Sequence, residues 1–233
     1  MIGCLTIGIN LIYPAPFVRL LLPARSKHAT GFTFSPDSGI LAGRKTIPWR
    51  TNVTDTLFDD LFKNYTDLVA RVDAHIERVA EGWGEHIACR KGCDSCCRPL
   101  TLFPVEAFAL ARAFDGLPER LKARARHQAQ ADPETCPLLV DSACLVYGAR
   151  PVICRTHGFP IYMDKSGETM VDFCPENFRG IKELPGEIML DLDQLNTLLT
   201  AVNRHFLASL DGRLPERIPV SEVLDLWAEL IPE

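Results

Sequence analysis

The chain has 233 residues, of which 47% are hydrophobic and 24% are charged, and its formal net charge at pH 7 is −5. This composition is ordinary for a soluble globular protein, and the length allows a substantial core without covalent cross-links. The mild acidity argues against nucleic acid or an anionic membrane as the main partner. The sequence also has no run approaching the roughly 18 apolar residues of a membrane span.

Residues 1–53 show no period of a helix or a strand, and Pro, Gly, Ser and Thr are scattered through residues 31–49. The apolar start is a poor signal peptide, because it has no early positive charge and because Pro14 and Pro16 interrupt it. We interpret residues 1–53 as a loosely ordered N-terminal extension, or as the result of a start site assigned too far upstream. We expect the protein to be cytoplasmic.

From residue 54 onward the sequence predicts helices with clear periods. Apolar residues recur every three or four positions from Leu57 to Trp83, which is the pattern of one long amphipathic helix over about residues 55–82. Pro104 suits the first turn of a second helix. The further helices are predicted at residues 104–114, 118–131, about 187–210 and within 220–231.

Between residues 136 and 174 the pattern changes to short apolar runs and turns, which predict short strands. Residues 161–173 resemble a hairpin closed by Ser166 and Gly167. Together these elements predict a helix-rich α+β fold, in which long helices brace a small, irregular, cysteine-rich metal-binding region. We expect residues 54–233 to form a single domain that contains this region at residues 85–178.

Cysteines are concentrated in that region: eight of the nine lie between residues 89 and 174, and four of them between residues 89 and 97. Disulfides are a poor explanation, because the flanking helices supply a core and disulfides are rare in reducing cytosol. Buried thiols explain scattered cysteines such as Cys4, but not four within nine positions on a polar background. Closely spaced thiolates bind zinc and iron. The predicted metal ligands are Cys89, Cys93, Cys96, Cys97, Cys136, Cys144, Cys154 and Cys174.

Residues between and beside these cysteines fit a metal site. Gly92 lets the backbone bend around an ion, and the adjacent Cys96 and Cys97 point in different directions, so they serve either different ions or one multinuclear centre. Thiolate charge has to be balanced by nearby cations or N–H donors. Basic residues within four positions of a cysteine either supply that charge or are solvated surface residues: Arg90, Lys91, Arg98, Arg150 and Arg155.

The order of these motifs resembles a known family. Cys-x3-Cys-x2-Cys-Cys is followed by Cys136-Pro-Leu-Leu, Cys144-Leu-Val-Tyr, Arg150-Pro-Val-Ile-Cys-Arg and Cys174. This order is similar to that of the YkgJ-type cysteine-cluster proteins over residues 85–178. The resemblance implies a domain that chelates zinc or iron, but it implies little about a biochemical role. A related cluster is attributed to flagellin lysine N-methylase, which leaves a protein-modifying enzyme open as an alternative.

Cys-x3-Cys-x2-Cys is also the spacing with which radical S-adenosylmethionine enzymes hold a [4Fe–4S] cluster that has one open iron. Here Cys97 and four further thiols are available to fill that open position, and Ser95 stands where those enzymes usually have an aromatic residue. The spacing does not match that of ferredoxins either. All-thiolate sites without an open position are usually structural zinc sites. Zinc is therefore favoured over iron, and an iron–sulfur redox protein remains the alternative.

No catalytic residue is predicted. We interpret His157 as a loop histidine, while a metal ligand, a hydrogen-bond partner of a ligand or the base of a Cys–His pair remain alternatives for it. Tyr147 and Arg150 are expected to orient their loop by packing and hydrogen bonds. Residues 119–128 form a basic run, which usually marks a solvated helix face. Nucleic acid is therefore not expected as a partner, whereas a protein partner remains open.

Overall fold

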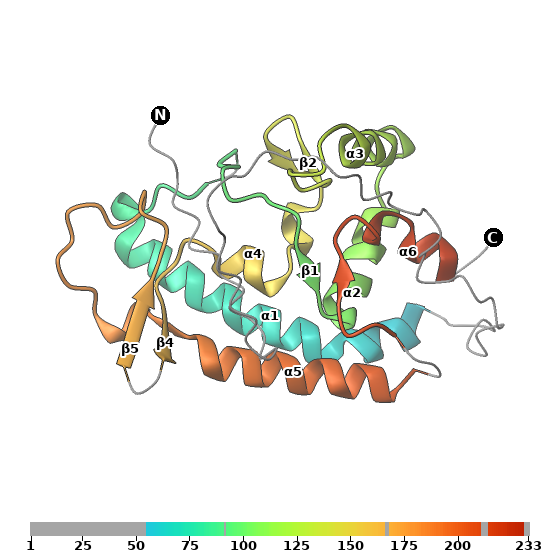
Figure 1. The fold of residues 1–233 in the computed structure, drawn as a ribbon. Coiled ribbons are helices and arrows are strands. Elements are labelled where there is room, and N and C mark those ends of the chain that lie inside the picture. The colour runs from blue at the N-terminus through green and yellow to red at the C-terminus, as the bar shows by residue number, and fades with distance from the viewer. Residues whose placement is uncertain (1–54, 91, 166–167, 211–213, 231–233) are drawn as a thin grey trace, which may run out of the picture.

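The computed structural model describes residues 55–90, 92–165, 168–210 and 214–230. The predicted extension, residues 1–53, lies outside these described residues. The two long helices, α1 (Asp55–Trp83) and α5 (Leu192–Ala208), lie side by side along the bottom of the molecule in the view of Figure 1. The other α-helices are α2 (Pro104–Asp115), α3 (Glu119–Ala131), α4 (Val152–Thr156) and α6 (Val223–Leu230).

The apolar period of the sequence becomes the buried face of α1. Tyr65, Leu68, Val72 and Val79 are buried on this face. The helix ends at Trp83, and a 3-10 turn then leads the chain toward the first cysteine of the cluster. The prediction of one long amphipathic helix is confirmed, and the helices predicted at residues 104–114 and 118–131 are confirmed to within one residue at each end.

The main core lies where α1, α2 and α5 meet. Phe206 of α5 stacks on Phe62 of α1 with ring centroids 5.5 Å apart, and it meets the ring of Phe108 from α2 edge-on at 5.4 Å. All three rings are buried. Aromatic pairs of this kind contribute about 0.5–1.5 kcal/mol beyond the burial of their surface. The three helices are therefore held to one another through a single aromatic cluster.

The helix predicted at about residues 187–210 begins later, at Leu192. The residues before it form a 3-10 turn and the short strand β6 (Leu190–Asp191), in which Leu190 pairs with Ile161. Because this backbone is bonded to a sheet, it does not continue the helix, and Asp191 caps α5 by accepting a hydrogen bond from the Gln194 amide at 2.9 Å. The apolar period runs through this boundary because Ile188 is buried as well.

Short strands form three small sheets within the described residues. The predicted hairpin is confirmed as the antiparallel pair β4 (Ile161–Lys165) and β5 (Glu168–Asp172), although its Ser166–Gly167 turn lies outside the described residues. Strands β2 (Leu139–Val140) and β3 (Ala143–Cys144) form a second hairpin. Its turn residues Asp141 and Ser142 have positive φ angles of 51° and 56°, as a type I′ turn requires. The third sheet pairs β1 (Thr101–Leu102) with β7 (Ile218–Pro219).

Helix α4 lies where the sequence pattern predicts only short strands and turns. Its first amide, that of Val152, donates a hydrogen bond to the carboxylate of Glu106 at 3.0 Å, and Glu106 is only 2% exposed. The partner that starts this short helix therefore comes from α2, far away in the sequence. The fold as a whole is helix-rich α+β, as predicted.

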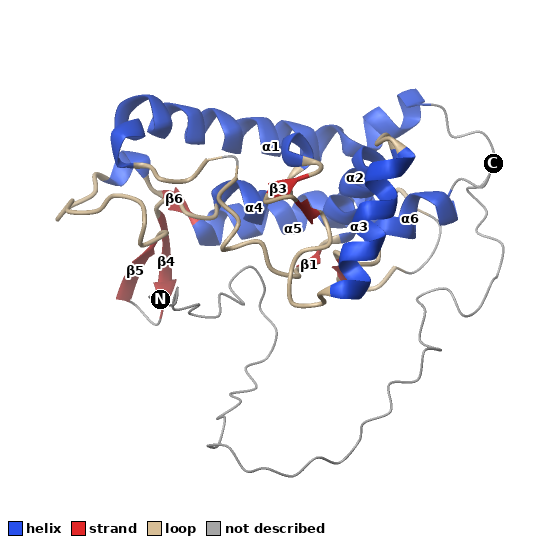
Figure 2. Cartoon of the chain, turned by 90° about the horizontal axis from the view of Figure 1, so that it is seen from above, coloured by secondary structure: helices blue, strands red, loops and turns tan. Residues whose placement is uncertain are grey.

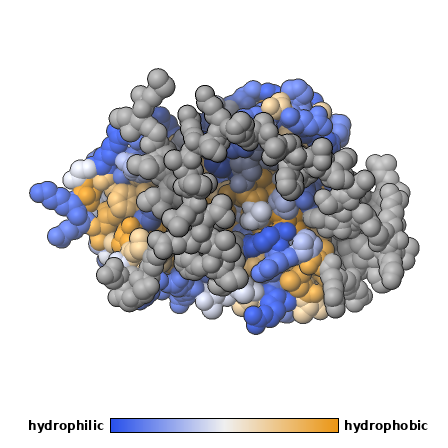
Figure 3. Space-filling model, in the orientation of Figure 1, coloured by the Kyte–Doolittle hydropathy of each residue, from blue (hydrophilic) through white to orange (hydrophobic). Residues whose placement is uncertain are grey.

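The described surface combines polar and apolar areas. On the face shown in Figure 3, apolar residues gather around the C-terminal end of α1 and the β4–β5 hairpin. Met170 and Val171 of β5 are 44% and 42% exposed. A search of the described residues for a helix with the length and hydropathy of a membrane span finds none.

Candidate metal-binding site

The described cysteines lie on loops and short elements beside the long helices. Four of them lie in the irregular stretch between α1 and β1, and the other four lie before β2, at the end of β3, in α4 and after β5. All eight are free thiols, so the disulfide explanation does not hold for the described residues. Cys93 and Cys96 are exposed and the other six are half-buried.

The stretch from Cys89 to Cys97 is a series of tight turns and not a helix. The amide of Cys93 donates to the carbonyl of Arg90 at 2.9 Å, and the amide of Cys97 donates to the carbonyl of Asp94 at the same distance. Gly92 adopts a φ of 96°, a conformation that favours glycine. The predicted bend at Gly92 is therefore present, and it folds the stretch back on itself.

Cys89 and Cys174 are brought together by Asn177, whose side chain is buried. The Asn177 Oδ1 accepts hydrogen bonds from the amides of Ala88 and Cys89, at 2.8 and 3.2 Å. Its Nδ2 donates to the Cys89 Sγ at 3.3 Å and to the Gly158 carbonyl at 2.6 Å. The Asn177 amide donates to the carbonyl of Cys174 at 2.9 Å, and the Cys174 amide donates to that of Gly158 at 3.3 Å. One side chain therefore connects three distant segments of the chain.

Gly158 marks how closely these segments approach. A Cβ atom at this position would lie 2.7 Å from the Cys89 Sγ and 3.4 Å from the Cys174 Cβ. The φ of Gly158 is also positive, at 96°. Only glycine satisfies both conditions without strain, so the absence of a side chain at Gly158 is what allows Cys89 and Cys174 to lie against the same backbone.

A second, small core supports this part of the site. Phe178 packs against Trp83 at the end of α1 with ring centroids 6.1 Å apart, and against Phe173 at 5.7 Å. Val79 and Ile188 are buried in the same cluster. The amide of Phe178 also donates to the carbonyl of His86 at 2.6 Å. The segment around Cys174 is thereby fixed to the end of α1 from which Cys89 emerges.

The side chains of His157, Cys96 and Cys97 form a hydrogen-bonded chain. The bond to Cys97 raises the pKa of Cys96, and the same bond lowers the pKa of Cys97, as expected if Cys96 keeps its proton and donates it. The bond to Cys96 raises the pKa of His157. A hydrogen-bond partner of a ligand and the base of a Cys–His pair are the two alternatives for His157 that this contact with Cys96 fits.

Cys97, Cys136, Cys144 and Cys154 form another neighbourhood. The amide of Cys136 donates to the carbonyl of Cys97 at 3.2 Å, and the β2–β3 hairpin places Cys144 opposite Leu139. Burial raises the pKa of Cys154, and the nearby thiols of Cys136 and Cys144 raise it further. The thiols of Cys136, Cys154 and Cys144 likewise oppose the lowering of the Cys97 pKa. These four thiols therefore lie close enough to affect one another electrostatically.

Arg150 is hydrogen-bonded to the loop between Cys144 and Cys154 and lies near their thiols. Arg150 lies with its guanidinium carbon 3.6 Å from the ring centroid of Tyr147, and it donates to the carbonyls of Tyr147 and Cys154 at 3.0 and 3.3 Å. Its charge lowers the pKa values of Cys144 and Cys154 against the effect of burial. The predicted role of Tyr147 and Arg150 in orienting their loop is confirmed.

Arg155, in contrast, forms an ion pair with a residue of α1. It is 9% exposed, and its Nη1 donates to both carboxylate oxygens of Asp73 at 2.7 and 2.6 Å. Its remaining nitrogens donate to the carbonyls of Arg150, at 2.6 Å, and Gly148. Neither alternative given for Arg155 therefore describes it: it is not a solvated surface residue, and its hydrogen bonds fasten the loop before α4 to the long helix.

The eight thiols of the described residues do not form a complete metal shell. Among the described residues, no group of three or more His, Cys, Asp or Glu side chains is arranged to hold a metal ion. The chemistry of the donor set nevertheless fits zinc or iron, because reduced thiols are the ligands that these metals take in all-sulfur sites. Burial raises the pKa values of Cys89 and Cys136 to about 11, so both stay protonated near neutral pH until a cation favours the thiolate.

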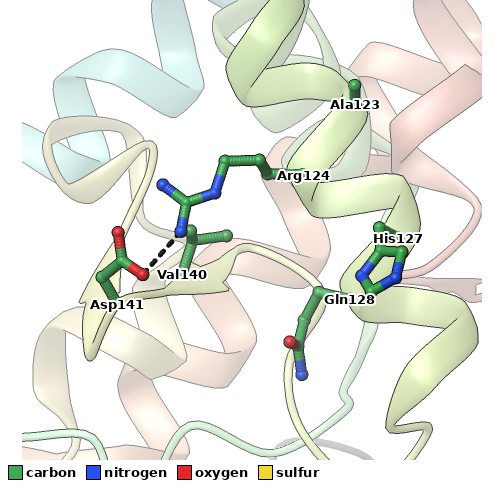
Figure 4. Close-up of a pocket in the computed structure, with 6 residues that line it drawn as sticks. All are labelled: Ala123, Arg124, His127, Gln128, Val140 and Asp141. Carbon is green, nitrogen blue, oxygen red and sulfur yellow. Dashed lines mark hydrogen bonds and ion pairs between the residues drawn. The ribbon is translucent and has the colours of Figure 1, made fainter.

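A surface pocket lies elsewhere, between α3 and the β2–β3 hairpin (Figure 4). In it, Arg124 points toward Asp141 and forms an ion pair at 2.5 Å. Two other basic side chains of α3 are also paired: Lys122 with Glu119 at 3.3 Å, and Arg126 with Asp225 at 3.1 Å. No cysteine lines the pocket, so it is separate from the thiols. The basic run is the charged helix face that the sequence predicts.

Sequence reasoning does not find three of the residues that build the site. Asn177 and Gly158 carry no pattern that distinguishes them from ordinary loop residues, and only the fold shows that they meet at Cys89. Glu106 belongs to the apolar helix α2, where an acidic residue at a buried position is the only signal. Its role, starting α4 from a distance, depends on tertiary contact.

The chain was compared with known families, curated proteins and solved structures. Residues 88–175 match the model of the family named CxxCxxCC, which is described as "Putative zinc- or iron-chelating domain". No curated protein and no solved structure gives a significant match. The matched residues include all eight clustered cysteines and leave all of α1, α5 and α6 outside. Residues 88–175 are therefore similar to the CxxCxxCC domain, and helices flank them on both sides in the sequence.

Proposed function

We propose that this protein is a metal-chelating protein in which zinc, bound by the clustered thiols, mainly organises the fold of residues 89–174. The observation that carries the proposal is the presence of eight reduced thiols within residues 89–174, on loops and short elements beside the long helices. The match to a family described by zinc or iron chelation supports it. The predicted ligands remain Cys89, Cys93, Cys96, Cys97, Cys136, Cys144, Cys154 and Cys174.

The helices provide a frame that does not itself need the metal. The aromatic cluster of α1, α2 and α5 contains no cysteine. The stretch from Cys89 to Cys97, in contrast, consists of turns with two exposed thiols, and few buried side chains hold it. Binding energy at a structural zinc site is folding energy. Zinc would therefore order the cysteine-rich region on a frame that is already folded, which gives a scaffold for a protein partner in the cytoplasm.

Elemental analysis of anaerobically purified protein, together with its optical spectrum, tests this proposal. Colourless protein that contains zinc supports it. A brown protein with broad visible absorption would instead indicate an iron–sulfur centre, and with it a redox role or a protein-modifying activity. Protein that contains neither metal, and that takes up neither under anaerobic conditions, would refute metal chelation altogether.

Replacing one ligand tests whether the metal organises the fold. Cys93→Ser should lower the metal content and increase proteolytic cleavage within residues 89–174, because an exposed thiol contributes little to packing and its loss acts through the metal. Cys4→Ser, which lies outside the matched domain, is the control and should change neither quantity. Unchanged metal content and unchanged cleavage in Cys93→Ser would contradict the proposal.

A further inference from the structure

We propose that the eight cysteines divide into two sites of four thiols, so that the chain binds two metal ions. This inference rests on the proposed metal binding and goes beyond it by assigning each thiol to one ion. The first site, which we name the Cys89 set, consists of Cys89, Cys93, Cys96 and Cys174. The second site, the Cys154 set, consists of Cys97, Cys136, Cys144 and Cys154.

The pairing of Cys89 with Cys174 is the firmest geometric fact about the Cys89 set. Both residues lie against Gly158, and the buried Asn177 bonds to the Cys89 sulfur and to the backbone of both cysteines. The three hydrogen-bonding atoms of this one side chain and its amide leave the two cysteines little freedom to separate. Any ion bound by Cys89 is therefore within reach of Cys174.

Cys93 and Cys96 join the Cys89 set through the turns that follow. The positive φ of Gly92 and the hydrogen bond from the Cys93 amide to the Arg90 carbonyl fold the chain back toward Cys89. The amide of Cys97 donates to the carbonyl of Asp94 at 2.9 Å, so Cys96 lies in a second tight turn that directly follows Cys93. The two exposed cysteines of the chain's described part thus belong to the same set, on the open side of Cys89.

The Cys154 set is built on different elements. The backbone bond from Cys136 to Cys97 joins the segment before β2 to the end of the turn region. The tight β2–β3 hairpin returns the chain to Cys144. Arg150 donates to the carbonyls of Tyr147 and Cys154, at 3.0 and 3.3 Å, and so joins the loop after Cys144 to α4, which carries Cys154. Figures 1 and 2 show the β2–β3 hairpin near α3 and the β4–β5 hairpin, which precedes Cys174, at the far end of the molecule. The hairpins that lead to Cys144 and to Cys174 therefore lie apart in the fold.

The adjacent cysteines form the junction between the sets. Cys96 lies in the turn that follows Cys93, whereas the carbonyl of Cys97 accepts a hydrogen bond from the amide of Cys136 at 3.2 Å. Adjacent residues in an irregular backbone present their side chains in different directions, which suits two ions and not one. The division also explains why there are eight clustered cysteines, because four thiolates complete the tetrahedral shell of one structural zinc ion and leave no open position.

Each set has its own compensation for negative charge. A zinc ion with four thiolates carries a net charge of about −2, and such a centre needs N–H donors or cations nearby. The Cys89 set receives the Asn177 Nδ2–H, and the Cys154 set has the guanidinium of Arg150, which donates to the Cys154 carbonyl at 3.3 Å. The neutral side chain of Asn177 therefore compensates charge in the Cys89 set, and the cation of Arg150 does so in the Cys154 set.

Zinc titration of the metal-stripped full-length chain, with zinc counted by elemental analysis, tests the division. The wild-type protein should bind two zinc ions. Cys174→Ser and Cys144→Ser should each bind about one. The double variant Cys144→Ser/Cys174→Ser, which damages both sets, should bind none tightly, whereas Cys89→Ser/Cys174→Ser, which damages one set twice, should still bind one. The comparison of the two double variants is decisive, because both lack two thiols.

A measurement on the unmutated protein covers the case in which the variants fail to fold. Zinc is withdrawn from the loaded protein with increasing chelator, and the thiols released at each step are alkylated and identified by mass spectrometry. Members of one set should lose protection together. Release of Cys89 together with Cys144, or of all eight thiols in one step, overturns the division.

The two proposals fail differently in these experiments. Wild-type protein that takes up no zinc and no iron overturns metal chelation, and the division falls with it. Wild-type protein that binds zinc but loses all of it in either single variant overturns the division alone, because it shows one shared centre. Equal zinc content in the two double variants overturns the division in the same way.

Discussion

The ion pair between Asp73 and Arg155 should be the main tie between α1 and the loop that carries Cys154. Both oxygens of Asp73 accept hydrogen bonds from Arg155, at 2.7 and 2.6 Å, and Arg155 is only 9% exposed. Asp73→Asn keeps the shape and removes the charge, so it leaves a buried guanidinium without its counter-ion. Breaking a buried pair costs about 3–5 kcal/mol. Because the Asp73 side chain is 38% exposed, solvent screening lowers our expectation to about 2 kcal/mol.

Asp67→Asn is a matched control on the same helix. Asp67 pairs with Lys63 at 2.7 Å, but the two side chains are 55% and 67% exposed. An exposed pair four residues apart contributes about 0.3–0.5 kcal/mol, and the effect of Asp→Asn on helix propensity is shared by both variants. The free energy of unfolding is measured by urea denaturation at one pH and one metal content. Equal destabilisation by the two substitutions would refute the assignment of Asp73 as a tie.

Two further substitutions probe the site and its support. Gly158→Ala should destabilise the protein by more than about 1 kcal/mol and lower its zinc content, because the new Cβ would lie 2.7 Å from the Cys89 Sγ at a positive φ. Gly186→Ala is the control, since a Cβ at Gly186 meets nothing within 4 Å, and it should change neither stability nor zinc content. Equal effects of the two substitutions would contradict the role assigned to Gly158. Burial raises the pKa of Glu106 to about 7 from 4.5, so the folded state holds a proton that the unfolded state releases, and stability should fall by about 3 kcal/mol as the pH rises from 4.5 to 7. Glu106→Gln should flatten this pH dependence in urea denaturation, and an unchanged slope would exclude Glu106 as its source.

The helical frame could be predicted from the sequence because its signal is local. The apolar residues from Tyr65 to Val79 recur with the period of a helix, and they are buried on one face of α1. The same reasoning misplaced the start of α5, since Ile188 continues the apolar period while its neighbours Leu190 and Asp191 are bonded to β4. The apolar period of a sequence indicates which side chains are buried. It does not indicate which backbone groups are hydrogen-bonded to another strand.

The candidate ligands could likewise be predicted from the sequence, because eight cysteines in one region indicate metal binding by thiolates. Only the tertiary structure decided which thiols lie near which. Cys89 and Cys174 meet through Asn177 and Gly158, and Cys97 meets Cys136 through a backbone hydrogen bond. Contacts between distant segments depend on how helices and hairpins pack, and residue types with their spacing determine the ligands without determining how those ligands are grouped.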